Sequence, residues 1–370
     1  MAYYHKLISL MLLGFLLGCT FLFVLLPERD FSPLENRMLQ TKPVPAPADL
    51  LSGNFTATFD QYVADQFVFR DWWVSLKVKV ERLLQKKEQN GVYFGKDGYL
   101  LQVLPQDNEE IWAENLVALD NFAKKSPVPV YFLPVPAAAQ VLPEKLPAFA
   151  APSPSYLEPG NFRSKLKHTA GIDVFNEFYG QEKYYYRTDH HWTTEGAYAA
   201  YRKTGEAVGF TPVARESFKI ETVAADFLGS LAARTGTQPQ PDVLQLFLPQ
   251  TPLPCRVEYV AEKRIEASFY AWEHIDSRDK YAVFLDGNHA LIKITTSVPK
   301  GRRLLVVKDS FANAMLPFLA HHYEEIYVVD LRFFHDNLAV FLWQQEVDEV
   351  LFLYGTMTLA TETVLRKLAI

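Results

Sequence analysis

The sequence predicts an α/β protein built on a parallel β-sheet with helices on both faces, preceded by a membrane helix and interrupted by a largely β insertion. Three observations support this fold class. An uncharged apolar run opens the chain, short apolar runs of strand length are followed by helical stretches, and residues 213–300 break this rhythm. Hydrophobic residues make up 49% of the 370 residues, which provides a real core and excludes a disordered chain.

The first element is an apolar run without a charge, residues 7–26. As a helix it spans about 30 Å, the thickness of a bilayer's hydrocarbon core. A cleaved signal peptide has a shorter apolar stretch and a small-residue cleavage site, so we favour an uncleaved anchor over a signal. Lipidation at Cys19 is an alternative, and the charges that flank the run do not specify its orientation.

A tether and a globular domain are expected to follow the membrane segment. Residues 27–52 are rich in proline and polar residues, which predicts a tether without helix, and residues 53–370 form the α/β domain. Helical spacing of apolar residues over 55–89 predicts one long or two shorter amphipathic helices. A hairpin at 91–102, with a Lys-Asp-Gly turn, then leads to a helix at 109–126.

The predicted sheet rests on apolar runs that have the continuous character of strands covered on both faces. These runs are residues 128–134, 303–308, 325–330 and 349–354. Because helical stretches separate them, we expect the strands to be parallel. The insertion at 213–300 contains proline-rich breaks and β-like pieces at 255–261 and 281–285.

Composition excludes several classes of partner and site. The net charge is −6 and no long Lys/Arg run occurs, so we expect no nucleic-acid partner. Two cysteines, Cys19 and Cys255, build neither a disulfide framework nor a CxxC zinc site. Asp189 with a neighbouring histidine would need two further ligands that the local spacing does not offer, so we predict no metal.

Ser310 is the first candidate for chemistry. Ligands bind at the carboxyl ends of strands in an open parallel sheet, and Ser310 follows the run 303–308 at a predicted strand–turn–helix junction. There its backbone N–H points along the helix axis and can stabilise a developing anion. The alternative is that Asp309 and Ser310 only cap the helix, as such residues commonly do.

The second candidate is an Asp-His-His-Trp sequence at residues 189–192, just before a predicted helix. An Asp two residues before a His can place both side chains on one face, so that the carboxylate orients the imidazole while its other nitrogen takes a proton. Asp189 and His191 have this spacing. His190 would point to the opposite side of an extended segment.

Two further sets of residues are candidates for the site. Gly287 and Asn288 are first of all a turn signal, and the functional interpretation is an oxyanion hole that the Gly287 N–H and the Asn288 amide form with the Ser310 N–H. Tyr186 and Trp192 could offer stacking faces to sugar rings. The alternative is that these aromatic residues belong to the core.

Together these blocks resemble the DHHW family, named for the residues at 189–192. The blocks that carry the resemblance include LENRML, GVYFGKDGYL, TDHHWTTEGAY, DFLGSL, FLDGNHALIKITT and VVKDSFANAMLPFL. The family is similar to the SGNH-like alginate O-acetyltransferases, which implies an SGNH or flavodoxin-like core with a permuted motif order. The resemblance also implies Ser310, His191 and Asp189 as a catalytic triad, with Gly287 and Asn288 at the oxyanion hole.

The resemblance implies an extracytoplasmic, membrane-anchored O-acetyltransferase at the cell surface or in the periplasm. It would act on hydroxyls of a cell-envelope or exported polysaccharide through an acyl-enzyme, beside a membrane-bound O-acyltransferase as acetyl source and without a bound cofactor. Two alternatives stay open. The same triad could form a carbohydrate O-acetyl esterase, or the chain could be a catalytically silent polysaccharide-binding or assembly component.

Overall fold

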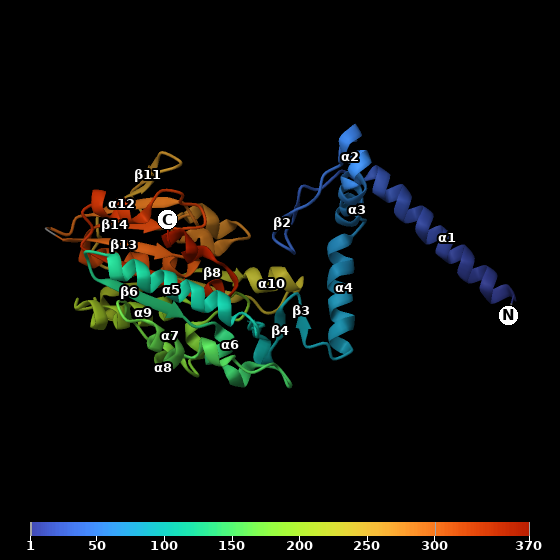
Figure 1. Cartoon of the computed structure of the whole chain (residues 1–370). Coiled ribbons are helices and arrows are strands. Elements are labelled where there is room, and N and C mark those ends of the chain that lie inside the picture. Colours follow the sequence, from blue (N-terminus) through green and yellow to red (C-terminus); the bar gives the residue numbers. More distant parts are fainter. Residues whose placement is uncertain (1, 300, 370) are drawn as a thin grey trace. The chain divides into compact units, whose positions relative to one another are not determined.

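The computed structural model describes residues 2–299 and 301–369, and the chain packs into two compact units (Figure 1). The N-terminal unit consists of Met1–Lys86 together with Ala232–Gln238. The sheet unit consists of Lys87–Leu231 and Pro239–Ile370. The domain boundaries expected after residues 26 and 52 stay predictions.

The N-terminal unit begins with the predicted apolar helix, α1 (Ala2–Leu25). Its segment Tyr3–Leu25 is long and apolar enough to cross a membrane, with a mean hydropathy of 2.5, a property that anchors and signal sequences share. A two-residue antiparallel ribbon follows, β1 (Phe31–Ser32) and β2 (Arg37–Met38).

Three short or medium helices complete this part of the chain: α2 (Pro47–Ser52), α3 (Asn54–Gln66) and α4 (Arg70–Leu83). The expectation of a tether without helix is therefore wrong for α2, which starts on Pro47, where the missing backbone N–H of proline costs no hydrogen bond. Residues 55–89 form two helices rather than one, because Phe69 takes a left-handed φ of 56° between them.

The sheet unit is built on an eight-stranded sheet in the order β11-β10-β12-β14-β13-β15-β6-β7 (Figure 1). Its strands are β6 (Val130–Val135), β7 (Ala170–Gly171), β10 (Cys255–Tyr259), β11 (Arg264–Glu266), β12 (Leu291–Thr296), β13 (Arg302–Lys308), β14 (Tyr323–Val329) and β15 (Glu349–Gly355). The strands from β14 to β7 are parallel, whereas β12, β10 and β11 join antiparallel.

The expected parallel sheet is therefore corrected to a mixed one. The antiparallel strands β10, β11 and β12 come from the predicted insertion, so the expectation of β-structure there is confirmed. These strands do not form a separate sheet, because they extend the edge of the main sheet. A short turn joins β10 to β11, and only antiparallel neighbours allow such a connection. The piece at 281–285, expected to be β-like, instead contains a 3₁₀ turn at Lys280–Val283.

The remaining elements are helices and two small sheets, and the helix Ser230–Thr235 runs from the sheet unit into the N-terminal unit. The helices are α5 (Glu109–Lys125), α6 (Ala138–Val141), α7 (Pro159–Lys165), α8 (Phe175–Phe178), α9 (Thr194–Val208), α10 (Ser230–Thr235), α11 (Leu316–Leu319), α12 (Leu338–Gln344) and α13 (Thr356–Thr361). Two smaller antiparallel sheets contain β3 (Glu88–Gln89), β4 (Val92–Phe94) and β5 (Leu100–Gln102), and β8 (Phe218–Phe227) and β9 (Asp242–Pro249). The pairing of β4 with β5 confirms the hairpin at 91–102.

Ring contacts show how helices cover the sheet. Phe122 of α5 contacts Phe352 of β15 at 5.5 Å, and Phe162 of α7 contacts Phe132 of β6 at 5.9 Å. Because Phe352 and Phe132 are register partners, α5 and α7 cover the same face. Val306, on the other face, is also fully buried, so both faces of the sheet are covered.

Candidate active site

The structure brings Asp189, His191 and Ser310 together, although Ser310 lies 119 positions beyond His191. His191 Nε2 lies 2.7 Å from Ser310 Oγ, and His191 Nδ1 lies 2.6 Å from Asp189 Oδ1. Catalysis by an activated nucleophile requires a base within hydrogen-bond distance of the nucleophile and a third group that orients the base. The two distances satisfy this requirement. The catalytic roles of the three residues stay predictions.

The short spacing between Asp189 and His191 builds half of this arrangement locally. The same Asp189 Oδ1 accepts a hydrogen bond from the His191 backbone N–H at 2.9 Å. An isolated bridge between Tyr185 and Trp192 closes the loop that carries both residues. After the loop, Thr193 caps α9 by accepting a hydrogen bond from the Gly196 N–H.

A second loop fixes the other oxygen of Asp189. The Ser230 N–H donates to Asp189 Oδ2 at 2.7 Å, and the Ser230 hydroxyl lies 2.7 Å from His190 Nδ1. A Cβ on Gly229 would stand 2.2 Å from the Asp189 Cβ, so only glycine allows this approach. The sequence contained these two residues in its DFLGSL block, but no local pattern connected them to Asp189.

Asp189 is well suited to stay ionised. It is 3% exposed, and burial by itself would raise its pKa. The neighbouring charges of His191 and His190, together with hydrogen bonds from His191 and from the Ser230 backbone, outweigh burial and hold the pKa well below its ordinary value. A carboxylate in this state can orient His191 and stabilise an imidazolium.

The ring of His191 is held by aromatic neighbours. Tyr281 stacks on it with the ring centroids 3.8 Å apart and the planes at 7°, and Phe311 packs against it at 5.1 Å. Both neighbours are buried. Sequence reasoning missed Tyr281, because it lies in the segment that was expected to be a strand and no spacing relates it to His191.

The turn that follows β13 separates the catalytic and capping interpretations of Ser310. Asp309 Oδ1 accepts a hydrogen bond from the Phe311 N–H at 3.1 Å, so Asp309 caps the 3₁₀ turn Ser310–Ala314. Asp309 Oδ2 accepts another from the Gly355 N–H at 2.8 Å. The Ser310 hydroxyl instead contacts His191, and Ser310 is partly exposed. The cap is therefore Asp309, whereas the Ser310 hydroxyl is engaged with His191.

The expected helix after β13 is interrupted. The 3₁₀ turn Ser310–Ala314 is followed by the separate short helix α11, which has Pro317 in its first turn. A proline has no backbone N–H, so a continuous helix from Ser310 would lack one of its hydrogen bonds. Ser310 nevertheless stands at the start of the turn, where backbone N–H groups have no partner within the helix.

The predicted oxyanion residues differ in what the structure allows. The Gly287 N–H donates to the Phe284 carbonyl at 3.2 Å, so it closes a turn and is not free for an oxyanion. Asn288 is exposed, and its Oδ1 accepts a hydrogen bond from Lys308 Nζ at 2.6 Å. Asn313, in the turn that Ser310 begins, donates to the Gly287 carbonyl at 2.8 Å. The 287–288 segment thus lies beside that turn.

Lys308 is a buried cation that sequence reasoning did not single out, because it ends an apolar strand. It has no exposed surface, and burial lowers its pKa to about 8. Its ammonium group lies 3.8 Å from Asp330 Oδ2, and Asp330 also accepts hydrogen bonds from Arg332. The short bond to Asn288 Oδ1 turns the amide nitrogen of Asn288 away from Lys308.

The two predicted sugar-stacking residues lie in the core. Trp192 has no exposed surface and contacts Phe311 at 5.5 Å and Phe178 at 6.3 Å. Its ring therefore has no face for a ligand, which corrects the stacking prediction for Trp192. Tyr186 is also buried and packs on Phe227 at 5.0 Å.

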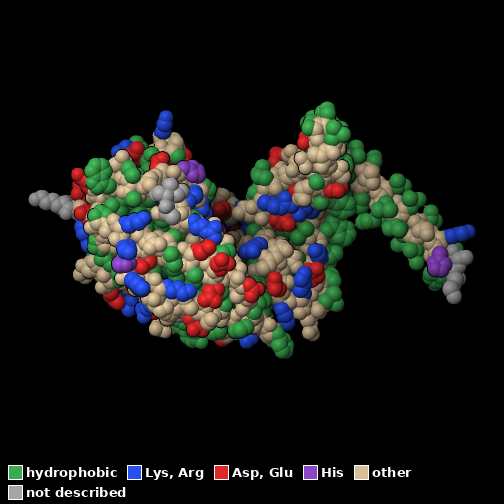
Figure 2. Space-filling view, viewed as in Figure 1, with side chains coloured by type: hydrophobic (Ala, Val, Ile, Leu, Met, Phe, Trp, Pro, Cys, Tyr) green, Lys and Arg blue, Asp and Glu red, His purple; other side chains and the backbone are tan. Residues whose placement is uncertain are grey.

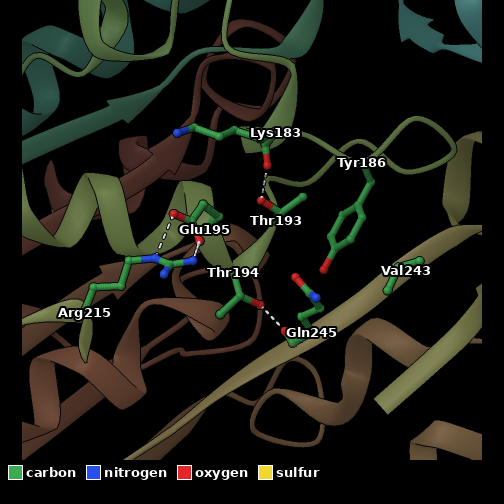
Figure 3. Close-up of a pocket in the computed structure, with 8 residues that line it drawn as sticks. All are labelled: Lys183, Tyr186, Thr193, Thr194, Glu195, Arg215, Val243 and Gln245. Carbon is green, nitrogen blue, oxygen red and sulfur yellow. Dashed lines mark hydrogen bonds and ion pairs between the residues drawn. The ribbon is translucent and has the colours of Figure 1, made fainter. Parts of the chain in front are cut away.

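Tyr186 nevertheless lines a cavity of about 450 Å³ at the start of α9 (Figure 3). Figure 3 shows its hydroxyl pointing toward Thr194 and Gln245. An ion pair between Arg215 and Glu195, 3.0 Å long, lines another part of the cavity. None of the three triad residues lines it.

Two clusters among the described residues have donor atoms close enough for a metal ion: Asp189 with His190 and His191, and Glu273 with His274 and Asp286. In the first, His191 uses both ring nitrogens in contacts with Asp189 and Ser310. In the second, Asp286 pairs with His274 at 2.5 Å and also with Arg264. Hydrogen bonds within the protein thus engage both clusters.

Comparisons with known proteins agree with the sequence resemblance. Residues 164–329 match the family described as DHHW protein. A DHHW family protein from Eubacterium siraeum is 25% identical, with a TM-score of 0.65 over 76% of this chain and 96% of that one. PatB1 from Bacillus cereus, solved with a sulfonyl adduct, is 22% identical, with a TM-score of 0.60 over 73% and 96% of the two chains.

A weaker structural match is the O-acetyltransferase domain of AlgJ from Pseudomonas putida. It is 18% identical, with a TM-score of 0.44 over 74% of this chain and 93% of that one. No curated protein sequence matches the chain. The predicted resemblance to DHHW proteins is confirmed.

Proposed function

We propose, from the match of residues 164–329 to the DHHW family, that this chain is an extracytoplasmic enzyme of the O-acetyltransferase type. Its substrate is a hydroxyl of a cell-envelope or exported polysaccharide. The observation that carries the proposal is the position of His191 between Ser310 and Asp189, within hydrogen-bond distance of both. The choice of acetyl transfer to a polysaccharide rests on the family resemblance.

In the first half of the proposed reaction, Ser310 Oγ attacks the carbonyl carbon of an acetyl ester. His191 Nε2 takes the Ser310 proton while Asp189 accepts the Nδ1–H and stabilises the imidazolium. The tetrahedral intermediate expels the donor alcohol, which receives the proton from His191, and an acetyl-Ser310 remains. In the second half, His191 takes the proton of the acceptor hydroxyl as this hydroxyl attacks the ester, and returns the proton to Ser310 Oγ when the bond between the acetyl group and the serine breaks.

For the oxyanion hole we propose two donors, the Ser310 N–H at the start of the 3₁₀ turn and the Asn288 amide. Support for Asn288 comes from Lys308, which holds the carbonyl end of the amide and leaves its N–H groups facing away. Gly287 has no such role in the proposal, because its N–H is used by Phe284. Each donor of this kind contributes about 3 kcal/mol to transition-state stabilisation.

The location and partners are part of the same proposal. The apolar helix α1 is retained as an anchor, and the sheet unit works at the cell surface or in the periplasm, as an SGNH-like core with a permuted motif order. Acetyl-CoA is not expected there, so the donor is an acylated membrane partner such as an O-acyltransferase, and no bound cofactor is needed.

A second candidate is a carbohydrate O-acetyl esterase with the same triad. The observation in its favour is the partial exposure of Ser310, which lets water reach an acetyl-Ser310. A chromogenic acetyl ester, supplied with and without oligosaccharide acceptors, separates the two. Transfer predicts acetylated oligosaccharide and a turnover that rises with acceptor, whereas hydrolysis that no acceptor changes would favour the esterase.

The variant Ser310→Ala tests the nucleophile against a silent binding protein. We expect ester turnover to fall at least about a thousandfold and covalent labelling by a sulfonyl fluoride to disappear. Thermal stability should change little, because Asp309 rather than Ser310 caps the turn. Ser164→Ala, at an exposed serine of α7, is the matched control and should keep both activities. Unchanged turnover and labelling in Ser310→Ala would overturn the proposal.

A further inference from the structure

The ring of His191 has partners on its faces as well as at its nitrogens. Tyr281 lies over it with the ring centroids 3.8 Å apart and the planes at 7°, and His190 lies over it at 3.8 Å and 36°. Two rings at this distance would overlap if both stood on one face, so Tyr281 covers one face and His190 the other. The nitrogens contact Asp189 and Ser310. His191 is only 6% exposed, so water has little access to a charge on its ring.

Tyr281 is fixed in this orientation by its own neighbours. It belongs to the 3₁₀ turn Lys280–Val283, whose last carbonyl accepts a hydrogen bond from the Ala271 N–H at 2.9 Å. Its ring packs on Tyr186 at 6.4 Å, nearly at right angles, and on Phe284 at 5.2 Å. Tyr281 is 5% exposed. Its ring therefore keeps one flat face against the imidazole, at a distance that leaves no room for water between them.

The hydroxyl of Tyr281 has no part in this contact. It is buried and has no hydrogen-bond partner among the residues that the structure describes. Burial also raises the pKa of Tyr281 well above its ordinary value, so the phenol stays neutral over the pH range of an ester assay. What Tyr281 supplies to the site is therefore the face of an uncharged aromatic ring. Such a face carries the negative part of the ring quadrupole and attracts a cation.

We propose that Tyr281 is a positioning residue that stabilises the imidazolium form of His191 by a cation–π interaction. When Ser310 Oγ attacks, its proton moves to His191 Nε2, and the ring becomes a cation while its Nδ1–H stays hydrogen-bonded to Asp189. A cation within about 6 Å of a ring centroid is attracted most strongly where water is excluded. The resting imidazole is neutral, so the ring face of Tyr281 favours the transition state over the ground state.

Other charges act on the same pair of rings. The titratable groups that face the two rings are Asp189, His190, Asp279 and Asp309. A substitution at Tyr281 changes none of these groups, so the difference between two variants at this position reports the ring face. The inference rests on the proposed role of His191 as the base, which belongs to the proposed function, but not on the choice of acceptor.

The test compares Tyr281→Leu with Tyr281→Phe in the full chain, by kcat/KM for a chromogenic acetyl ester as a function of pH. Tyr281→Phe is the matched control, because it keeps the ring face and removes only the hydroxyl that has no partner. Leucine is apolar but has no such face. We expect Tyr281→Phe to stay within about twofold of the unmodified chain, and Tyr281→Leu to lose about tenfold or more at the plateau.

The acid limb of the pH profile carries the decisive information. In Tyr281→Leu this limb should move lower by about one pH unit, because the imidazolium of the free enzyme loses the same stabilisation as the transition state. A loss at the plateau without a shift of the limb would overturn the inference, since Tyr281 would then only hold His191 in place. An equal effect in Tyr281→Phe would also overturn it, because the hydroxyl would then be responsible.

A second series keeps the test decisive if Tyr281→Leu fails to fold. Mono-, di- and trifluorinated phenylalanines at position 281 keep the shape of the ring while they withdraw negative charge from its face. The acid limb should move lower with each added fluorine, and a limb that stays in place through the series would contradict the inference.

Failure of the proposed function gives a different result. Ester turnover that persists in Ser310→Ala would overturn the proposed function, and this inference with it. Turnover that depends on Ser310 but is the same in every Tyr281 variant would overturn the inference alone and leave the triad intact.

Discussion

The two units of the chain distribute polar and apolar groups in opposite ways. The sheet unit buries charged groups, with Asp189 and Lys308 almost completely enclosed. The N-terminal unit exposes large apolar groups, among them Trp72 and Leu83. Each arrangement is costly for a protein surrounded by water alone.

The difference teaches what each unit needs from its surroundings. In the sheet unit the cost of burial is offset internally, because Asp189 has three hydrogen-bond donors and Lys308 has an amide oxygen and a carboxylate nearby. In the N-terminal unit large apolar side chains along α4 stay exposed (Figure 2), although Trp73 meets Phe15 of α1. The sheet unit thus satisfies its buried charges internally, whereas the N-terminal unit leaves apolar surface open to solvent. Substitutions that remove or displace a polar contact in either unit test this contrast.

After Ser310→Ala, the largest effect in the sheet unit is expected from Asn288→Ala. Loss of an oxyanion donor should lower kcat for acetyl-ester turnover by about 10²–10³-fold with little change in KM, because the donor acts in the transition state. Lys308→Met keeps the Asn288 amide but releases its carbonyl end, so a smaller loss of kcat is expected. Steady-state kinetics of both variants provide the measurement. An Asn288→Ala enzyme with normal kcat would remove Asn288 from the site.

A smaller loss is expected from Gly229→Ala. The new Cβ would stand 2.2 Å from the Asp189 Cβ, so the carboxylate must move, and a displacement of about 1 Å costs roughly 10²-fold in rate. Gly160→Ala is the control, because a Cβ there meets nothing within 4 Å. Kinetics with the chromogenic ester and thermal unfolding of both variants measure the effect. Full activity in Gly229→Ala would show that the exact position of Asp189 is unimportant.

The smallest effect concerns Asp65, which fastens the chain after α1. Its side chain is buried and accepts hydrogen bonds from Arg37 and from the Gln40 N–H. These hydrogen bonds hold the pKa of Asp65 below its ordinary value, although burial by itself would raise it. A depressed carboxyl pKa contributes stability that is present above pH about 4 and is lost as the pH falls. We expect Asp65→Asn to remove about 1–2 kcal/mol, discounted because Arg37 is partly exposed.

Hydrogen exchange of peptides from residues 27–46, corrected for intrinsic rates, measures this contribution between about pH 2 and pH 7. Protection in the unmodified chain should be constant above about pH 4 and fall below it, whereas protection in Asp65→Asn should be low throughout. Asp60→Asn, at an exposed position of α3, is the control and should behave like the unmodified chain. Equal protection in Asp65→Asn and the unmodified chain at pH 7 would contradict the assigned role.

The sequence by itself determined the features that depend on neighbouring residues. The uncharged run at 7–26 specifies α1, the hairpin at 91–102 has its own turn, and the spacing of Asp189 and His191 lets one carboxylate contact both the backbone and the ring of the histidine. Apolar runs likewise located the central strands. These features follow from side-chain periodicity and short-range hydrogen bonding, which one stretch of sequence contains.

Only the tertiary structure decided which distant segments meet. It placed Ser310 against His191, stacked Tyr281 on the ring, and made Asp309 rather than Ser310 the cap. In the folded chain the Gly287 N–H also donates to the Phe284 carbonyl, and strands from the insertion pair antiparallel with the edge of the sheet. These outcomes depend on the packing of segments far apart in the chain, because side-chain spacing fixes which way a residue faces but not which segment lies opposite.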